Sequence, residues 1–440
     1  MARPVMQVLL AAAGEPWETD VVQALQRPGS TLTLVRRCMD VPDAVATAAS
    51  GQADLVLFGP GLPGLDTDAI ARVREAGAVP VGLVGSAVDA DDAADGEGSA
   101  RLQRLGVACV VAWTDLDELP AALAAADAAA LGLDGSAGSG GAVGFRADGL
   151  GVSGGEFGVE GSATPRGRLI AVWGPAGSPG RSTVALGLAA ELAERRAPTL
   201  LVDADVYGGA TAQMLAVLDE VSGLLAAARL ANAGSLDLMA LHGHIREINP
   251  HLRILTGLPR ADRWPQLRPA ALSQVLHVAR QMAPTVIVDC GFCLEQDEEL
   301  SFDTAAPRRN GATLLVLEQA DQVLTVGSAD PLGLSRLARG VLDLREAVPG
   351  VDVSIVVNRV RAGLGWSHDE IGENVHRFTG LTPTAYLPED RAAIDKAWVG
   401  GRSLVECAPD APLRRALRDL AADVGRLPVT RRRRGRLRGR

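Results

Sequence analysis

Gly174-Pro-Ala-Gly-Ser-Pro-Gly-Arg-Ser-Thr183 is the stretch of sequence that decides the fold. An apolar run, residues 169–173, precedes it and an apolar helical pattern, residues 184–193, follows it, so we expect a strand-to-helix turn. Glycine-rich turns of this kind bind phosphate, because backbone N–H groups and the helix N-terminus point at the anion. The stretch therefore predicts a phosphate-binding loop, with a plain strand-to-helix turn as the alternative. The predicted ligands are Gly174, Gly177, Ser178, Gly180, Arg181, Ser182 and Thr183.

The loop departs from the usual pattern at its charged position. The pattern ends in Gly-Lys-Ser/Thr, whereas this chain has Gly180, Arg181 and Ser182, and Pro175 stands at the first glycine position. Lys396 is the single lysine of the chain, so Arg181 fits a general exchange of lysine for arginine. A guanidinium is planar and larger than an ammonium, so the exchange is not conservative in a tight loop. We expect nucleotide binding to survive better than catalysis.

Three further apolar runs end in polar side chains, at Asp203 with Asp205 two residues on, at Asp289 and at Asn358. Ligands of parallel sheets bind at the carboxyl ends of the strands, where carboxylate and hydroxyl oxygens can hold Mg²⁺. Taken one by one, such residues often only cap the next helix or turn. The ordered set predicts a Mg²⁺-nucleotide site with Ser182, Asp203 and Asp289 at the metal.

These motifs resemble the MinD/ParA family of deviant-Walker ATPases over residues 167–427. Within that family they are most similar to the CpaE/TadZ branch associated with Flp pilus assembly and to septum-site-determining-like proteins of actinobacteria. The family's loop reads Lys-Gly-Gly-x-Gly-Lys-Thr/Ser-Thr. The resemblance therefore places Ala176 at the signature lysine, which reaches the phosphates of a second subunit, and Arg181 at the P-loop lysine.

The resemblance implies ATP and Mg²⁺ as cofactors and a catalytic role for Asp205 and Arg181. Asp203 would hold a Mg²⁺-bound water, Asp205 would orient the attacking water, and Asp289 would be the Walker B acid. Asn358 would touch adenine, and Arg359 and Pro388 would border the nucleotide. No residue near Ala176 in the sequence restores the missing cation. Because such a cation stabilises the transferring phosphoryl group, we expect weak ATP hydrolysis or none.

Composition narrows the class of protein. With 440 residues, of which 47% are apolar, the chain predicts two or three domains. The aromatic content of 3% and the net charge of −10 argue against a surface that stacks bases or coats DNA. Five scattered cysteines predict no disulfide framework, hence a cytoplasmic protein. The Cys290-x-x-Cys293 pair is either half a zinc or redox site or two packed thiols, and the lack of a second pair favours packing.

Residues 1–128 predict a second doubly wound α/β domain. The opening run is either a signal peptide or a buried first strand. Short β-rich runs then alternate with helical patterns at residues 41–49 and 67–76, and five βα units predict a flavodoxin-like sheet. The runs cover residues 31–35, 53–58, 79–84 and 108–112.

This first domain resembles the CheY-like receiver domain of response regulators. The resemblance places Gly59 at the phosphate-accepting position and alanines, residues 11–13, at the acidic pair that would bind Mg²⁺. Residues 113–115 offer no lysine, and Asp66 and Asp68 are the alternative acceptors. The resemblance implies a pseudo-receiver that serves interaction or dimerisation.

Two segments of biased composition complete the chain. Residues 129–166 are rich in Gly, Ser and Ala and predict a flexible linker, whereas residues 428–440 form an arginine-rich tail. The tail is either a solubilising extension or a contact with anionic lipid or, less favoured, with DNA phosphates, through Arg431–Arg440.

The whole pattern predicts a cytoplasmic homodimer with peripheral membrane contact. It would position pilus or secretion machinery, or the division site, at the inner membrane face. The alternatives are a ParA-like partition ATPase on nucleoid DNA and a nucleotide-independent scaffold.

Overall fold

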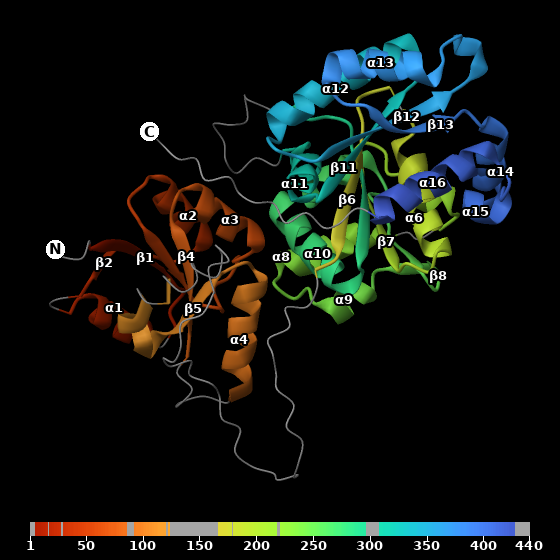
Figure 1. Ribbon diagram of the computed structural model, residues 1–440. Coiled ribbons are helices and arrows are strands. Elements are labelled where there is room, and N and C mark those ends of the chain that lie inside the picture. The colour runs from red at the N-terminus through yellow and green to blue at the C-terminus, as the bar shows by residue number, and fades with distance from the viewer. Residues whose placement is uncertain are drawn as a thin grey trace, which may run out of the picture. The chain divides into compact units, whose positions relative to one another are not determined.

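The computed structural model describes two compact units, one around a five-stranded sheet and one around an eight-stranded sheet (Figure 1). Most of the predicted linker, the arginine-rich tail and Ser178 lie outside the described residues. The structure describes residues 5–15, 17–27, 30–85, 92–119, 122–123, 166–177, 179–217, 221–295 and 308–426.

The five-stranded sheet is parallel and has the order β2-β1-β3-β4-β5, which is the flavodoxin-like order. The apolar run at the start of the chain forms strand β1, which agrees with the interpretation of this run as a buried first strand. Its strands are β1 (Met6–Ala11), β2 (Leu32–Cys38), β3 (Leu55–Phe58), β4 (Val79–Val84) and β5 (Cys109–Ala112). The helices along this part of the chain are α1 (Glu18–Leu25), α2 (Val41–Ala49), α3 (Thr67–Glu75), α4 (Asp92–Arg104) and the 3₁₀ helix η1 (Trp113–Glu118).

The eight-stranded sheet has the order β13-β12-β11-β6-β10-β7-β9-β8. Its strands are β6 (Arg168–Trp173), β7 (Thr199–Ala204), β8 (Arg246–Asn249), β9 (Leu252–Leu255), β10 (Thr285–Cys290), β11 (Gln322–Ser328), β12 (Val353–Val360) and β13 (Pro383–Pro388). The predicted fold class, two doubly wound α/β sheets, is confirmed.

One edge of this otherwise parallel sheet is antiparallel. Strand β8 pairs with β9 in the antiparallel direction. The cause lies in the connecting turn, where the side-chain oxygen of Asn249 accepts hydrogen bonds from the backbone N–H groups of His251, at 2.9 Å, and Leu252, at 2.8 Å. This Asx turn reverses the chain within three residues, which leaves no room for a crossover helix.

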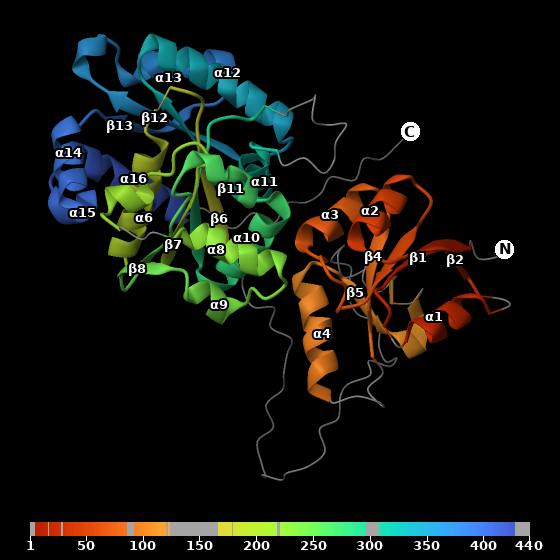
Figure 2. The same ribbon diagram turned by 180° about the vertical axis from the view of Figure 1, so that it is seen from behind.

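Helices cover both faces of the eight-stranded sheet (Figures 1 and 2). The longer ones are α6 (Arg181–Glu194), α8 (Gly223–Asn232), α10 (Pro269–Met282), α11 (Gly311–Gln319), α12 (Pro331–Ala347), α13 (His368–Thr379), α14 (Arg391–Gly400) and α16 (Pro412–Arg426). The shorter ones are α7 (Thr211–Met214), α9 (Leu238–His242), α15 (Leu404–Cys407) and the 3₁₀ helices η2 (Ala261–Gln266) and η4 (Ala362–Leu364).

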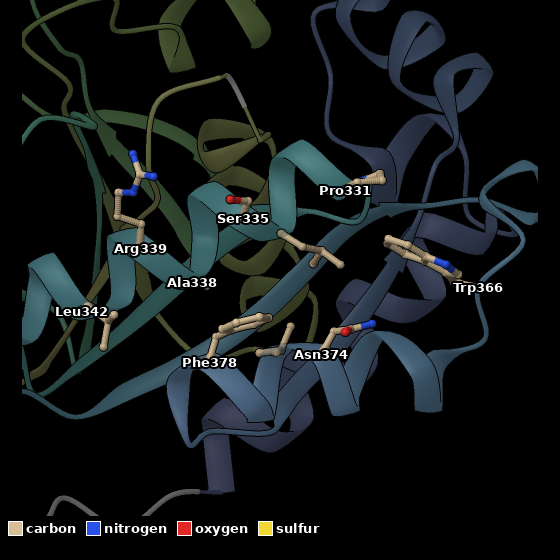
Figure 3. A pocket seen from close by; sticks show the side chains of 10 residues that line it. Pro331, Ser335, Ala338, Arg339, Leu342, Trp366, Asn374 and Phe378 are labelled. Carbon is tan, nitrogen blue, oxygen red and sulfur yellow. The ribbon is translucent and has the colours of Figure 1, made fainter.

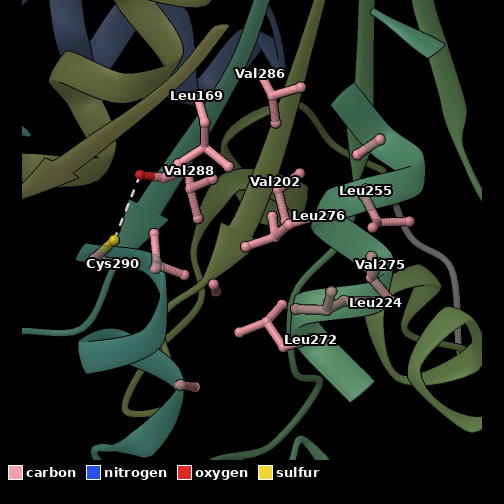
Figure 4. Close-up of a cluster of buried hydrophobic side chains, with 14 of the residues drawn as sticks. Leu169, Val202, Leu224, Leu255, Leu272, Val275, Leu276, Val286, Val288 and Cys290 are labelled. Atoms are coloured by element: carbon pink, nitrogen blue, oxygen red, sulfur yellow. Dashed lines mark hydrogen bonds between the residues drawn. The ribbon is translucent and has the colours of Figure 1, made fainter. Parts of the chain in front are cut away.

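Alternation along the strands divides the core into two layers. In β6, Leu169 and Trp173 pack in the layer that includes α8, α10 and α11, part of which Figure 4 shows. Ile170 and Val172, on the other face, pack in the layer that includes α6 and α16. Because both faces are buried, the strand has to be apolar at every position, which is why it appears in the sequence as a continuous apolar run.

The register of the central strands brings the predicted polar residues to one edge of the sheet. Asp289 at the end of β10 is directly opposite Asp203 of β7, and Val172 of β6 is its partner on the other side. Farther along, Asn358 of β12 pairs with Ser328 of β11. The phosphate loop leaves the sheet from β6, and so it starts between these two groups.

Candidate nucleotide-binding site

The predicted phosphate loop connects β6 to α6, and its glycines are required by the backbone. Gly177 and Gly180 have φ angles of 110° and 99°, in the left-handed region that side chains disfavour. A Cβ atom on Gly174 would overlap the carbonyl oxygen of Val326 on the neighbouring strand β11. Among the described residues, no side chain caps the N-terminus of α6. The first N–H groups of this helix therefore remain available for an anion.

The guanidinium of Arg181 is held between the loop and the end of β10. Its Nη1 donates to the carbonyl oxygen of Gly174 at 3.2 Å, and its Nε donates to that of Cys290 at 3.2 Å. Its Nη2 lies 3.5 Å from Oδ2 of Asp205, and the side chain is 11% exposed. The guanidinium of Arg181 is thus already bonded to oxygen atoms of the protein.

Asp289 is fully buried, and within the described residues neither of its carboxylate oxygens accepts a hydrogen bond of normal geometry, although the Ser182 hydroxyl is close enough to act on it. Burial raises its pKa well above the ordinary value, and the charge of Asp203 raises it further, whereas the Ser182 hydroxyl acts in the opposite direction. An unpartnered buried carboxylate is costly unless a cation or proton compensates it.

The donor set around Asp289 fits Mg²⁺. Carboxylate and hydroxyl oxygens, here from Asp289 and Ser182, are the hard ligands that this ion prefers. Within the described residues, no group of three or more His, Cys, Asp and Glu side chains forms a ready-made metal site. This suits Mg²⁺, which usually takes one or two protein ligands and completes its shell with water and substrate phosphates.

The other two predicted carboxylates reach the same edge of the sheet but are bonded to protein groups. Oδ2 of Asp203 accepts from the backbone N–H and the hydroxyl of Thr211, at 3.0 and 2.8 Å. Burial raises the pKa of Asp203, and the two bonds from Thr211 oppose that shift. Oδ1 of Asp205 accepts from the N–H of Tyr207 at 2.8 Å, while its Oδ2 faces Arg181.

Of the residues predicted on the adenine side, Asn358 lies next to the loop and Arg359 near it. The amide of Asn358 donates to the carbonyl oxygen of Pro179 at 2.7 Å, so this group stabilises the loop in the free protein. Arg359 has a φ angle of 58°, is exposed, and lines a small hollow beside Ala176 and Gly177. Pro388 is half-buried at the end of β13, paired with Val360.

Thr183, the last predicted loop residue, lies in the first turn of α6 and lines a separate hollow with Ile394 and Trp398 of α14. Ser178 falls outside the described residues.

An aromatic pair beside the carboxylates was not predicted from the sequence. The rings of Tyr207 and Phe292 have centroids 4.6 Å apart, and the Arg181 guanidinium carbon lies 5.9 Å from the Phe292 centroid. Tyr207 follows the end of β7 and Phe292 follows the end of β10. This position after a strand is the one feature of the sequence that could have indicated them.

The Cys290 and Cys293 thiols are both free, and Cys290 is buried in the core. The thiol of Cys290 lies 3.6 Å from the carbonyl oxygen of Val288 (Figure 4). Burial raises its pKa well above the ordinary value, so this thiol is a weak nucleophile.

The corresponding edge of the five-stranded sheet has a different chemistry. A Cβ atom on Gly59, the position of the phosphate acceptor in receivers, would lie 2.8 Å from Cζ2 of Trp17. The indole thus occupies the space in which an acidic side chain would stand. Glu18 is buried nearby in the chain, and its oxygens accept from the N–H groups of Gly14 and Glu15 and pair with Arg37.

The loop, the glycines and the carboxylates together define a P-loop type of α/β domain. Among solved structures, a ParA family ATPase from Chlorobium tepidum TLS superposes with a TM-score of 0.50 at 20% identity, covering 58% of this chain and 98% of that one. The cell-division ATPase MinD of Pyrococcus furiosus gives 0.47 at 21% identity over 60% of this chain and 100% of that one. The unit around the eight-stranded sheet therefore has the fold of a ParA family ATPase.

Two comparisons by sequence found nothing similar. No protein-family model matches the chain, and no curated protein matches it.

Proposed function

We propose that this chain binds Mg-ATP at the loop between β6 and α6, and acts as a MinD/ParA-like positioning protein with weak ATP hydrolysis or none. The observation that carries the proposal is Asp289, whose two buried oxygens have no hydrogen-bond partner among the described residues. A protein without a cation to bind would gain stability from an apolar residue at this place.

The chain's own residues would divide the work of binding. The N–H groups at the start of α6 would take up phosphate oxygens. Ser182 and Asp289 would hold Mg²⁺, which supplies charge neutralisation for the phosphates when bound. Asp203, fixed by Thr211, would accept a hydrogen bond from the hydration shell, and Asn358 would hold the loop at Pro179.

The expectation of slow hydrolysis rests on two groups. Asp205, which would have to orient the attacking water, is already bonded to the N–H of Tyr207 and faces Arg181. Ala176 is exposed and brings no charge to the position of the signature lysine. Without the lysine that would reach the transferring phosphoryl group from a second subunit, several kcal/mol of transition-state stabilisation are missing.

The larger role would be to position pilus or secretion machinery, or the division site, as a homodimer at the inner membrane face. None of the helices in the described residues is long and apolar enough to span a bilayer. Membrane contact would therefore be peripheral, through Arg431–Arg440, which lie outside the described residues. The alternatives are nucleoid DNA as the tail's ligand, or a scaffold that ignores nucleotide.

Isothermal titration with a slowly hydrolysed ATP analogue, with and without Mg²⁺, tests the nucleotide site. We expect saturable, Mg²⁺-dependent binding that Ser182→Ala weakens and Asp289→Asn deprives of its Mg²⁺ dependence. Ser335→Ala, an exposed serine in α12, is the matched control and should bind as the wild type does. Absence of heat and of thermal shift at millimolar nucleotide would leave the scaffold alternative.

Sedimentation with vesicles tests the tail. Replacing the arginines of Arg431–Arg440 by glutamine should release the full chain from anionic vesicles and leave its affinity for neutral vesicles unchanged. Tight, salt-sensitive binding to duplex DNA with no vesicle binding would favour the partition ATPase.

A further inference from the structure

Helix α12 packs closely along the phosphate loop. Three of its residues, Gly333, Arg336 and Gly340, are spaced three and four apart and so lie on one face of the helix. A Cβ atom on Gly340 would lie 3.2 Å from Cβ of Pro175, and one on Gly333 would lie 2.5 Å from the carbonyl oxygen of Ser328. Gly340 therefore lets the helix approach the loop and Gly333 lets it approach the end of β11, with Arg336 between them.

The guanidinium of Arg336 lies directly against Gly177. A Cβ atom on Gly177 would overlap its Nη1 and would lie 3.5 Å from its Cζ. Arg336 is exposed, and within the described part of the chain neither a carboxylate nor a carbonyl oxygen is bonded to it. It differs in this from Arg181, whose guanidinium is bonded to protein oxygens.

A hollow of about 60 Å³ lies beside the loop, and Arg336 and Arg359 both line it. Asp330 is the acidic residue of the lining. Its oxygens accept from the hydroxyl of Ser328 and the N–H of Gly333, so it is committed to capping α12. The hollow is thus lined by the two arginines, Arg336 and Arg359, and by the exposed Ala176. Its carboxylate, Asp330, is bonded to Ser328 and Gly333.

We infer that Arg336 is a nucleotide-binding residue that supplies, from the same subunit, the positive charge that the loop lacks at Ala176. The inference rests on the proposed nucleotide site. Its ligand is the phosphate chain of the nucleotide, bound between the guanidinium and the loop backbone. Since the cation comes from α12 of the same chain, nucleotide affinity does not depend on a second subunit.

The test compares two arginines of one helix in the full chain. Arg336→Gln should weaken binding of the ATP analogue roughly 10-fold or more, the usual loss for a charged hydrogen bond. Arg339→Gln is the matched control, because Arg339 lies on the same helix and lines the apolar groove between α12 and α13 instead (Figure 3). It removes the same charge and should leave affinity within about twofold. Arg336→Lys should restore part of the affinity, because the positive charge is kept while the planar set of donors is lost.

Each outcome decides the inference. Wild-type affinity in Arg336→Gln, with Ser182→Ala still weakening binding, overturns the role of Arg336 and leaves the nucleotide site intact. Equal losses in Arg336→Gln and Arg339→Gln indicate a diffuse charge effect and also overturn it, as does an affinity that rises with protein concentration. A wild-type chain that binds no nucleotide overturns the inference and the proposed function together. Melting temperatures of all variants within about 2 °C of wild type exclude misfolding as the cause.

Discussion

Each of the two sheets has a buried carboxylate near the carboxyl ends of its parallel strands, and the two carboxylates differ in their partners. Glu18, after β1, is 3% exposed and accepts from two backbone N–H groups while it pairs with Arg37. Asp289, at the end of β10, is fully buried, and in the described part of the chain neither of its oxygens has a hydrogen-bond partner. The charge of Glu18 is thus compensated by groups of the protein, whereas that of Asp289 requires a cation or a proton.

This difference separates a structural carboxylate from one suited to a ligand. Similar sheets place acidic groups at the same edge, so position alone does not distinguish the two uses. Satisfaction of hydrogen bonds does, because a buried unpartnered charge persists only where a ligand or a proton compensates it. The two edges should therefore differ measurably in stability, titration, assembly and reactivity.

The glycines that follow β6 and β3 at these two edges, Gly174 and Gly59, should differ most. In Gly174→Ala the new methyl group meets the backbone carbonyl of Val326, which cannot move without the sheet, so we expect a loss of about 3 kcal/mol or more. In Gly59→Ala it meets the side chain of Trp17, which can rotate, and the loss should be about 1 kcal/mol. Urea unfolding of both variants measures the contrast. Equal losses would show that the two strand ends are equally rigid.

The carboxylates themselves should respond with opposite signs. Glu18→Gln removes the charge from three hydrogen-bonded partners and should cost about 2 kcal/mol in the free energy of unfolding. Asp289→Asn removes an uncompensated buried charge and should be neutral or stabilising without Mg²⁺ at neutral pH. Destabilisation of the Mg²⁺-free protein by Asp289→Asn would mean that the carboxylate has a partner after all.

The pH dependence of that second variant follows from the raised pKa of Asp289. Between the ordinary carboxyl pKa and the raised one, the folded state holds a proton that the unfolded state has lost, so the wild type loses stability as pH rises. The amide that replaces the carboxylate does not titrate. The stability advantage of Asp289→Asn should therefore grow from about pH 4 upward. An advantage that shrinks with rising pH would contradict the sign of the shift.

A smaller effect is expected on assembly. Because Ala176 is uncharged, the oligomeric state should barely change between ADP and ATP, and turnover should stay far below a typical ~10 s⁻¹. Ala176→Lys together with Arg181→Lys should increase ATP-dependent dimerisation, and Ala176 is exposed enough to admit the longer side chain. Light scattering in each nucleotide state measures this. A wild type that is monomeric with ADP and dimeric with ATP would show that the missing cation has no consequence.

We expect no phosphorylation at the edge of the five-stranded sheet. Incubation with acetyl phosphate should leave the intact mass unchanged, because Gly59 has no carboxylate and Trp17 fills its surroundings. Asp54 accepts from the N–H of Gln7, and Asp66 caps α3 at the N–H of Ala69. An added phosphoryl group mapping to Asp54, Asp66 or Asp68 would show that a receiver function survives.

The sequence allowed the strands and the strand-end residues to be predicted for a common physical reason. A parallel strand buried on both faces has to be apolar throughout, so its end is marked by the first polar residue, as at Asp203 and Asp289. The edge strand β8 lacks that signal, because it is mostly exposed and its turn depends on one side chain, Asn249.

Contacts between distant segments could not be read in the same way. Nothing in the spacing shows that Thr211 holds Asp203, that Asn358 holds Pro179, or that Arg336 covers Gly177. The pair of glycines seven residues apart in α12 was the one available hint of a close helix approach. Such partners are chosen by tertiary packing, which local patterns do not record.

The hydrogen bond from Asn358 to the loop carbonyl of Pro179 has a consequence for the rate and entropy of binding. It joins the end of β12 to the loop before any ligand arrives, and Ala329 in turn donates to the backbone of Asn358. Folding of the sheet thus immobilises the backbone that a nucleotide would otherwise have to order on arrival. Association should then proceed without a slow conformational step, and release of water should dominate its entropy.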